Sequence, residues 1–71
     1  MKKQYVIYSR SEHMKGYIVG KFIFQGGTYY SLSRDIKNAK HYNTKLGAEN
    51  AIKIIQSKSP YMAVLDVEEV E

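Results

Sequence analysis

The sequence predicts a small α+β domain, in which one amphipathic helix packs on one face of a mainly antiparallel sheet of about four strands. Three observations predict it. Runs of β-branched and aromatic residues flank Gly26 and Gly27, an apolar stripe of helical period follows Thr44, and short strand-like runs stand near both ends of the chain. The expected order is strand, strand, strand, helix, strand. With 71 residues, the chain has the length of a single domain, 1–71.

The first strand is predicted over residues 4–9, which are rich in Tyr, Val and Ile. Residues 10–16 are polar and charged and end in a glycine. This composition predicts a surface loop that joins two antiparallel strands.

Residues 17–33 predict a β-hairpin with Gly26 and Gly27 as its two-residue loop, because such loops need positive φ angles that glycine reaches freely. This register pairs Phe24 with Tyr29 and makes both faces of the hairpin apolar. One face carries Val19, Ile23, Tyr30 and Leu32, and the other carries Ile18, Phe22, Phe24 and Tyr29. We expect the helix to cover the first face, which leaves the second as the surface for a partner.

The segment between hairpin and helix has no clean period. Ser33 or Asp35 predicts the cap of one short helical turn that ends at Ala39, and residues 40–42 predict a short extended piece.

Thr44 predicts the N-cap of the main helix, expected over residues 45–57. Apolar side chains recur on one arc of this helix at Ala48, Ala51, Ile52, Ile54 and Ile55. Pro60 ends the helix, since proline cannot continue it. Residues 61–67 predict the last strand, and we expect the acidic tail, 68–71, to fray.

Charge is distributed unevenly around the formal net value of +4, because residues 1–65 hold all 11 Lys and Arg but only three of the seven acids. A basic body of this kind suits a polyanion or an acidic protein. A small protein kept soluble by its lysines has the same pattern.

Catalytic and metal-binding patterns are weak. The chain has no cysteine and no glycine-rich phosphate loop, and its two histidines, His13 and His41, have no ligand spacing around them. Ser11, Glu12 and His13 are adjacent in a loop and cannot converge as a triad. We therefore expect no enzyme, cofactor, metal or small-molecule substrate. No apolar run approaches the roughly 20 residues that cross a bilayer, so we expect a cytoplasmic protein without a membrane partner.

Seven tyrosines interleave with basic residues. Sheet-borne aromatics with flanking cations can stack bases and bind phosphates, and tyrosine is also favoured at protein interfaces and in strands generally. The residues that would form a nucleic-acid site are Lys21, Arg34, Lys37, Lys40 and Tyr42.

A resemblance adds context. Residues 29–51 contain an Asp-x-x-x-Ala-Lys-x-aromatic run, a Thr cap and an Ala-rich helix, matched here by Asp35, Ala39, Lys40, Tyr42, Thr44, Ala48 and Ala51. This pattern resembles small proteins of phages and prophages in Gram-positive bacteria, staphylococcal ones in particular. That family has no activity to transfer, and the resemblance implies a cytoplasmic accessory protein that binds a host protein or nucleic acid.

The leading hypothesis is a non-enzymatic interaction module that binds a protein partner, or a second copy of itself as a homodimer, through an exposed aromatic sheet face. The residues expected to bind are Phe22, Phe24 and Tyr29. Nucleic-acid binding through the basic set is the alternative.

Overall fold

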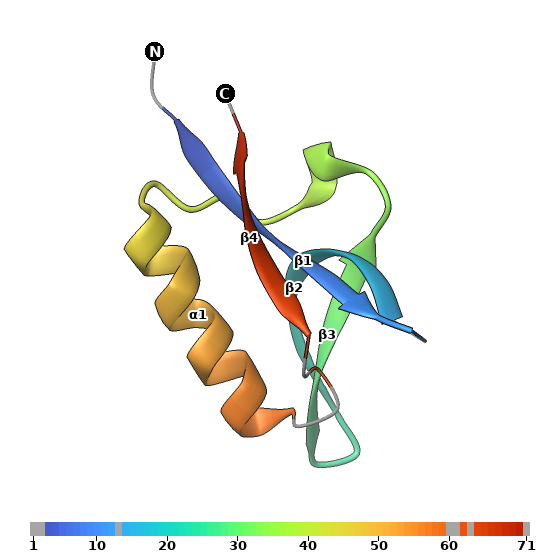
Figure 1. The fold of residues 1–71 in the computed structure, drawn as a ribbon. Helices are drawn as coiled ribbons and strands as arrows, with labels where there is room; N and C mark the ends of the chain where they lie inside the picture. The colour runs from blue at the N-terminus through green and yellow to red at the C-terminus, as the bar shows by residue number, and fades with distance from the viewer. Residues whose placement is uncertain (1–2, 13, 60–61, 63, 71) are drawn as a thin grey trace.

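A computed structural model describes residues 3–12, 14–59, 62 and 64–70 of the chain. Its elements, in order, are β1 Gln4–Ser11, β2 Met14–Phe24, β3 Gly27–Ser33, the 3₁₀ turn η1 Ile36–Asn38, α1 Lys45–Lys58 and β4 Leu65–Val70. The four strands form one antiparallel sheet in the order β3-β2-β1-β4. Helix α1 packs on one face of it, against β1 and β4 (Figure 1). The predicted α+β class and element order are confirmed.

β1 and β2 pair over only part of their lengths. Their register runs from Ser11 opposite Met14 to Tyr8 opposite Tyr17. Beyond that point β2 pairs with β3 alone, and the first half of β1 forms a bridge with Tyr42 instead, through hydrogen bonds of 2.8 and 2.7 Å to Tyr5. The far end of the β2–β3 hairpin therefore diverges from the rest of the sheet.

The segment between β3 and α1 follows the sequence prediction closely. Asp35 caps η1, and its side chain accepts a hydrogen bond of 2.9 Å from the Lys37 amide. Ala39 ends the turn, and the Lys40 amide then donates to the Ile18 carbonyl at 3.0 Å. This segment fills the gap where β1 and β2 separate.

The predicted hairpin loop is wrong by one residue. The turn is formed by Gln25 and Gly26, with φ angles of 51° and 79°, and Gly27 already pairs with Phe24 as the first residue of β3. A left-handed φ costs a non-glycine residue roughly 1–2 kcal/mol. The shifted register instead pairs Phe22 with Tyr29, whose rings stack with centroids 5.7 Å apart.

The predicted faces of the hairpin are partly wrong, because the ladder shifts register between Ile18 and Gly20 and leaves Val19 unpaired. This irregularity puts Ile18, not Val19, on the helix side with Tyr30 and Leu32. Ile18 and Tyr30 are buried, in line with the expectation that the helix takes the Leu32 face. Alternation still leaves the aromatic side chains of Phe22, Phe24 and Tyr29 on the opposite, outer face.

Helix α1 begins as predicted and ends one residue later. Thr44 is its N-cap, and the Thr44 hydroxyl accepts a hydrogen bond of 3.0 Å from the Gly47 amide. At the other end the buried Ser59 donates from its amide to the Ile55 carbonyl at 2.8 Å and from its hydroxyl to the Thr28 carbonyl at 3.3 Å. The last hydrogen bond joins the end of the helix to the hairpin.

The last strand lies further along the chain than predicted. It includes residues 68–70, which the sequence predicts to fray and which here pair with residues 4–6 of β1. Tyr61 and Ala63, expected in this strand, lie outside the described residues. The acidic tail is therefore part of the sheet as far as Val70.

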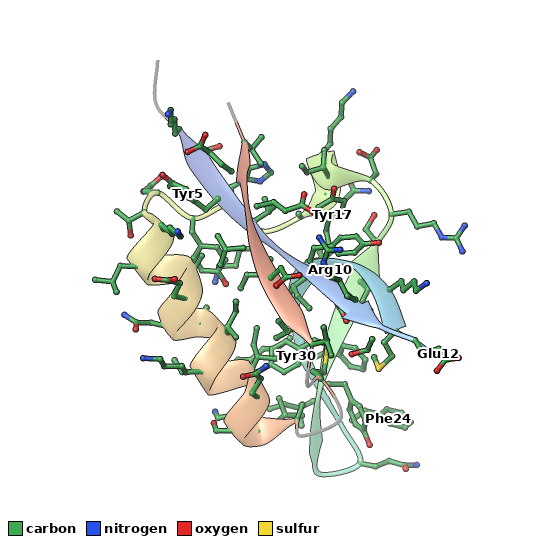
Figure 2. The ribbon with its side chains drawn as sticks, in the orientation of Figure 1. Tyr5, Arg10, Glu12, Tyr17, Phe24 and Tyr30 are labelled. Carbon is green, nitrogen blue, oxygen red and sulfur yellow. The ribbon has the colours of Figure 1, made fainter. Side chains whose placement is uncertain are left out.

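The core lies between the sheet and α1. Its buried residues come from every layer: Ile7, Ile18, Tyr30, Ala48, Ile55 and Met62. Figure 2 shows Tyr30 on the side of the hairpin that faces α1 and Phe24 on the opposite side. The helix thus closes one face of the sheet, and the outer face carries the surface that a partner could reach.

Candidate functional site

One part of the outer face of the sheet carries a group of interacting residues on the three adjacent strands β2, β1 and β4. Tyr8 and Tyr17 pair across the strands and meet edge to face, with ring centroids 4.9 Å apart. The Tyr17 hydroxyl donates to the Glu68 carboxylate at 3.2 Å, and Arg10 forms an ion pair with Asp66. We call these five residues the tyrosine cluster. Its rings and its charged groups all have partners within the chain.

The contact with Glu68 also affects the chemistry of Tyr17. Desolvation raises the pKa of the Tyr17 phenol above its ordinary value of 10.0, and the adjacent Glu68 carboxylate raises it further. The phenol therefore stays protonated at neutral pH and remains a donor. Tyr17 acts here as a structural hydrogen-bond donor that joins β2 to β4.

The same face carries three exposed aromatic side chains near the β2–β3 turn, at the end of the hairpin that diverges from β1. Phe22 is 50% exposed, Phe24 56% and Tyr29 40%. Phe22 and Tyr29 stack on each other at an interplanar angle of 26°. We call Phe22, Phe24 and Tyr29 the hairpin patch. Ile23, on the helix side of the same hairpin end, is also largely exposed.

All three residues of the hairpin patch are those that the sequence singles out as partner-binding. The structure brings them together on one face although the predicted register is shifted, because the turn and the irregularity at Val19 change pairings without moving Phe22 or Phe24 to the helix side. Their exposure is a property of the structure. Their role in binding stays a prediction.

The residues of the predicted nucleic-acid site divide between two places. Lys21, Lys40 and Tyr42 line a single pocket between α1 and the hairpin. Arg34 borders a different, shallow depression beside Lys15, and Lys37 lies on η1. The structure therefore does not gather the whole basic set in one pocket.

The pocket lined by Lys21, Lys40 and Tyr42 has a volume of about 230 Å³, and we call it the lysine groove. It lies where β2 leaves β1 and where residues 40–42 replace the missing strand neighbour. Ile18 and Tyr30 line it from the hairpin, and Ile54 and Ile55 line it from α1. The groove thus results from the divergence of the two strands, a feature that sequence periodicity does not reveal.

Two tyrosines, Tyr30 and Tyr42, and two lysines, Lys21 and Lys40, form the polar part of the lining of the lysine groove. Lys40 Nζ lies 5.4 Å from the centre of the Tyr42 ring, within the range of a cation–π contact. Burial raises the pKa of the Tyr42 phenol above 10.0, and neighbouring Tyr30 adds to this rise. The Tyr42 ring is half-buried and packs against the core.

The sequence does not predict the roles of two sets of residues. Tyr17 and Glu68 are 51 positions apart, and Glu68 falls in the tail that the sequence predicts to fray. The sequence predicts Tyr30, Ile54 and Ile55 only as residues of the hairpin and helix faces that pack together, and they also line the lysine groove. The alternation of acids with Val67 was the one available signal that the strand continues into the tail.

Metal-ligating residues do not converge in the described part of the chain, where no three His, Asp or Glu side chains form a metal-binding group. His41 makes a contact of 2.8 Å between Nδ1 and the Ala39 carbonyl. His13 lies outside the described residues. No helix among the described residues has the length and hydrophobicity needed to cross a membrane.

Comparisons with known proteins found no matching family model, no similar curated sequence and no similar solved structure. Two surfaces of the molecule are candidates for a function. One is the hairpin patch on the outer face of the sheet, and the other is the lysine groove on the helix side.

Proposed function

We propose that this protein is a small non-enzymatic interaction module whose hairpin patch binds an apolar surface of another protein chain. One observation carries the proposal: Phe22, Phe24 and Tyr29 stand together on one sheet face, each between 40% and 56% exposed. Aromatic side chains supply large and rigid contact areas and are enriched where proteins associate. A cluster of them on a small domain marks a surface for association.

The edge of the sheet beside the hairpin patch supports the same proposal. β3 is an edge strand, and none of its residues, 27–33, is charged. β4, at the opposite edge, carries Asp66, Glu68 and Glu69. Charged residues on an edge strand oppose pairing with another chain, so the edge next to the hairpin patch is the one that a partner strand can approach.

The resemblance to small phage and prophage proteins agrees with this role. The resemblance carries no activity to transfer, but it implies a cytoplasmic accessory protein that binds a host protein or nucleic acid, and an aromatic patch suits the binding of a protein. The identity of the partner follows from experiment. A second copy of the chain is the first partner to test, because an identical patch would meet its own apolar surface across a two-fold axis.

Sedimentation velocity over a range of protein concentrations tests self-association. We expect the wild-type chain to sediment faster as concentration rises, and Phe22→Ser with Phe24→Ser to weaken the association at least about tenfold. Leu46→Ser is the matched control, since Leu46 is an equally apolar side chain that is 66% exposed on α1. It should leave the association unchanged.

If the wild-type chain is monomeric, the next test is for a partner other than a second copy. The chain, immobilised through its N-terminus, would be exposed to a bacterial lysate beside the Phe22→Ser, Phe24→Ser variant. The proposal requires a protein that the wild type and the Leu46→Ser control retain and the double variant loses. A strictly monomeric chain that retains no such protein contradicts it.

Nucleic-acid binding is a second candidate, favoured by the meeting of Lys21, Lys40 and Tyr42 at one groove. A mobility-shift titration with single-stranded oligonucleotides at low and moderate salt tests it. Binding to phosphates must weaken steeply as salt rises, because bound counterions are released. Lack of a shift at low salt would exclude this candidate.

A further inference from the structure

The lysine groove combines an apolar lining with unpaired positive charge. No acidic residue lines it, and the described residues offer no carboxylate as an ion-pair partner to Lys21 or Lys40. Lys21 is paired with Tyr30 across the hairpin, so its side chain projects on the same side as the Tyr30 ring. Two cations thus border an apolar pocket without a neutralising group.

The size of the groove limits what it can hold. An apolar cavity of about 150 Å³ accommodates one benzene molecule. The lysine groove, at about 230 Å³, has room for one ring or a short branched chain together with a small polar head. Pockets for drug-sized ligands run to roughly 300–1,000 Å³, so the groove suits a ligand smaller than these, and not a dinucleotide or a long acyl chain.

Ile54 adds an independent observation. It lines the groove from α1 and is 56% exposed, whereas Ile55, the next residue on the helix, is buried in the core. A β-branched apolar side chain left at the rim of a pocket gains free energy when a ligand covers it. Together with the two cations, it defines a site with an apolar wall and a positive mouth.

We propose that the lysine groove binds a small organic anion, in which a carboxylate or phosphate head is attached to a single ring or a short branched chain. Lys21 and Lys40 bind the head, and Ile54, Tyr30 and Tyr42 contact the body. Charge-assisted hydrogen bonds supply the preference for an anion. This site goes beyond the proposed association and lies on the opposite side of the hairpin, so the two can fail separately.

The test uses titrations of the ¹⁵N-labelled full chain followed by two-dimensional NMR. Phenylacetate and phenyl phosphate are the probes, and phenylacetamide is the uncharged match of phenylacetate. We expect both anions to shift the amide signals of Gly20, Lys21 and Ala51, which line the groove. Phenylacetamide and inorganic phosphate should each bind at least about tenfold more weakly, since each lacks one half of the interaction.

Substitutions at the rim separate charge from packing. Ile54→Glu puts a carboxylate at the mouth of the groove and should remove binding of the anions, whereas Ile54→Gln has the same size without the charge and should retain the preference for anions. Lys21→Met with Lys40→Met keeps the aliphatic stems and should weaken binding at least about tenfold. Lys53→Met is the control and should change nothing, because Lys53 lines a different depression, between α1 and β4.

Three results would overturn the proposal. The first is equal binding of phenylacetamide and phenylacetate, and the second is binding that survives Ile54→Glu. The third is the absence of shifts at Gly20, Lys21 and Ala51 with either anion. If an oligothymidylate shifts these signals when neither small anion does, the groove belongs to a nucleic-acid site instead.

Discussion

The tyrosine cluster and the hairpin patch lie on the same face of the same sheet, and both are built on an aromatic pair that joins neighbouring strands. Tyr8 and Tyr17 form one pair, and Phe22 and Tyr29 form the other. Beside the first pair, Glu68 accepts a hydrogen bond from Tyr17, and Arg10 forms an ion pair with Asp66. The rings of the second pair are exposed to solvent.

The difference arises from the strands that flank each pair. Tyr8 lies on β1, in the middle of the sheet, so β4 can bring Asp66 and Glu68 beside it. Phe22 and Tyr29 lie on the part of the hairpin that has left β1 and has β3 as its outer edge. Among the described residues, no third strand pairs with this end of the hairpin to supply polar partners. Whether an aromatic pair in this sheet is structural or available for binding therefore depends on whether an adjacent strand supplies polar partners to it.

The largest expected effect compares one tyrosine from each region. Tyr8→Ala should lower the free energy of unfolding by about 2 kcal/mol, because it removes a partly buried ring that Tyr17 and Arg10 both contact. Tyr29→Ala should cost at most about 1 kcal/mol, the value of a single exposed stacking contact. Urea denaturation of the two variants measures the difference. Equal losses would mean that the two regions do not differ in their structural role.

The hairpin turn provides the next test. Gln25 has a φ of 51°, in the left-handed region that glycine adopts without strain. Gln25→Gly should therefore raise the free energy of unfolding by up to about 1 kcal/mol, the strain relieved less the entropy that glycine adds to the unfolded chain. Thermal unfolding measures it. A loss of stability would show that the turn does not have Gln25 and Gly26 at its centre.

The stability of the fold should depend on alkaline pH through Tyr17 and Tyr42. The pKa values of Tyr17 and Tyr42 are raised in the folded chain, so the unfolded chain releases these protons first as the pH passes about 10. Stability is thus unaffected below that pH and falls as pH rises through the folded values. Tyr42→Phe should make this fall smaller in urea titrations between neutral and alkaline pH. An unchanged pH profile in Tyr42→Phe would contradict the shielding of this ring.

The smallest effect concerns the ion pair of the tyrosine cluster. The Arg10 and Asp66 side chains are about half exposed, and surface pairs of this kind contribute about 0–1 kcal/mol. Asp66→Asn should lower the free energy of unfolding by at most about 0.5 kcal/mol, and by less at high salt. Urea denaturation at two salt concentrations measures this. A large, salt-independent loss would assign Asp66 a packing role.

Local signals predicted most of the fold. Thr44 as N-cap, Asp35 as the cap of η1 and the glycine-containing turn all depend on residues within a few positions of each other, and each lies close to its predicted place. The hairpin register was wrong because two glycines offer two loops, and the sequence around them fits both. The stacking of Phe22 on Tyr29 accompanies one of the two loops, and this contact is visible only in the folded structure.

The candidate site was predictable to a smaller extent. The apolar run of the hairpin predicts that Phe22, Phe24 and Tyr29 lie on one face, because alternation is a property of the strand alone. The lysine groove depends on where β2 leaves β1, and that is set by the irregularity at Val19 and by the bridge from Tyr42 to Tyr5. Neither feature has a local signature, so the groove could be found only in the structure.

We propose that this chain associates through the hairpin patch and not through the tyrosine cluster. The most direct measurement follows the amide signals of the ¹⁵N-labelled chain as it is diluted, and then with any protein that the lysate experiment retains. We expect shifts or broadening at Phe22, Phe24 and Tyr29 and unchanged signals at Tyr8 and Tyr17. Changes centred on Tyr8 and Tyr17, with a silent hairpin, would contradict it.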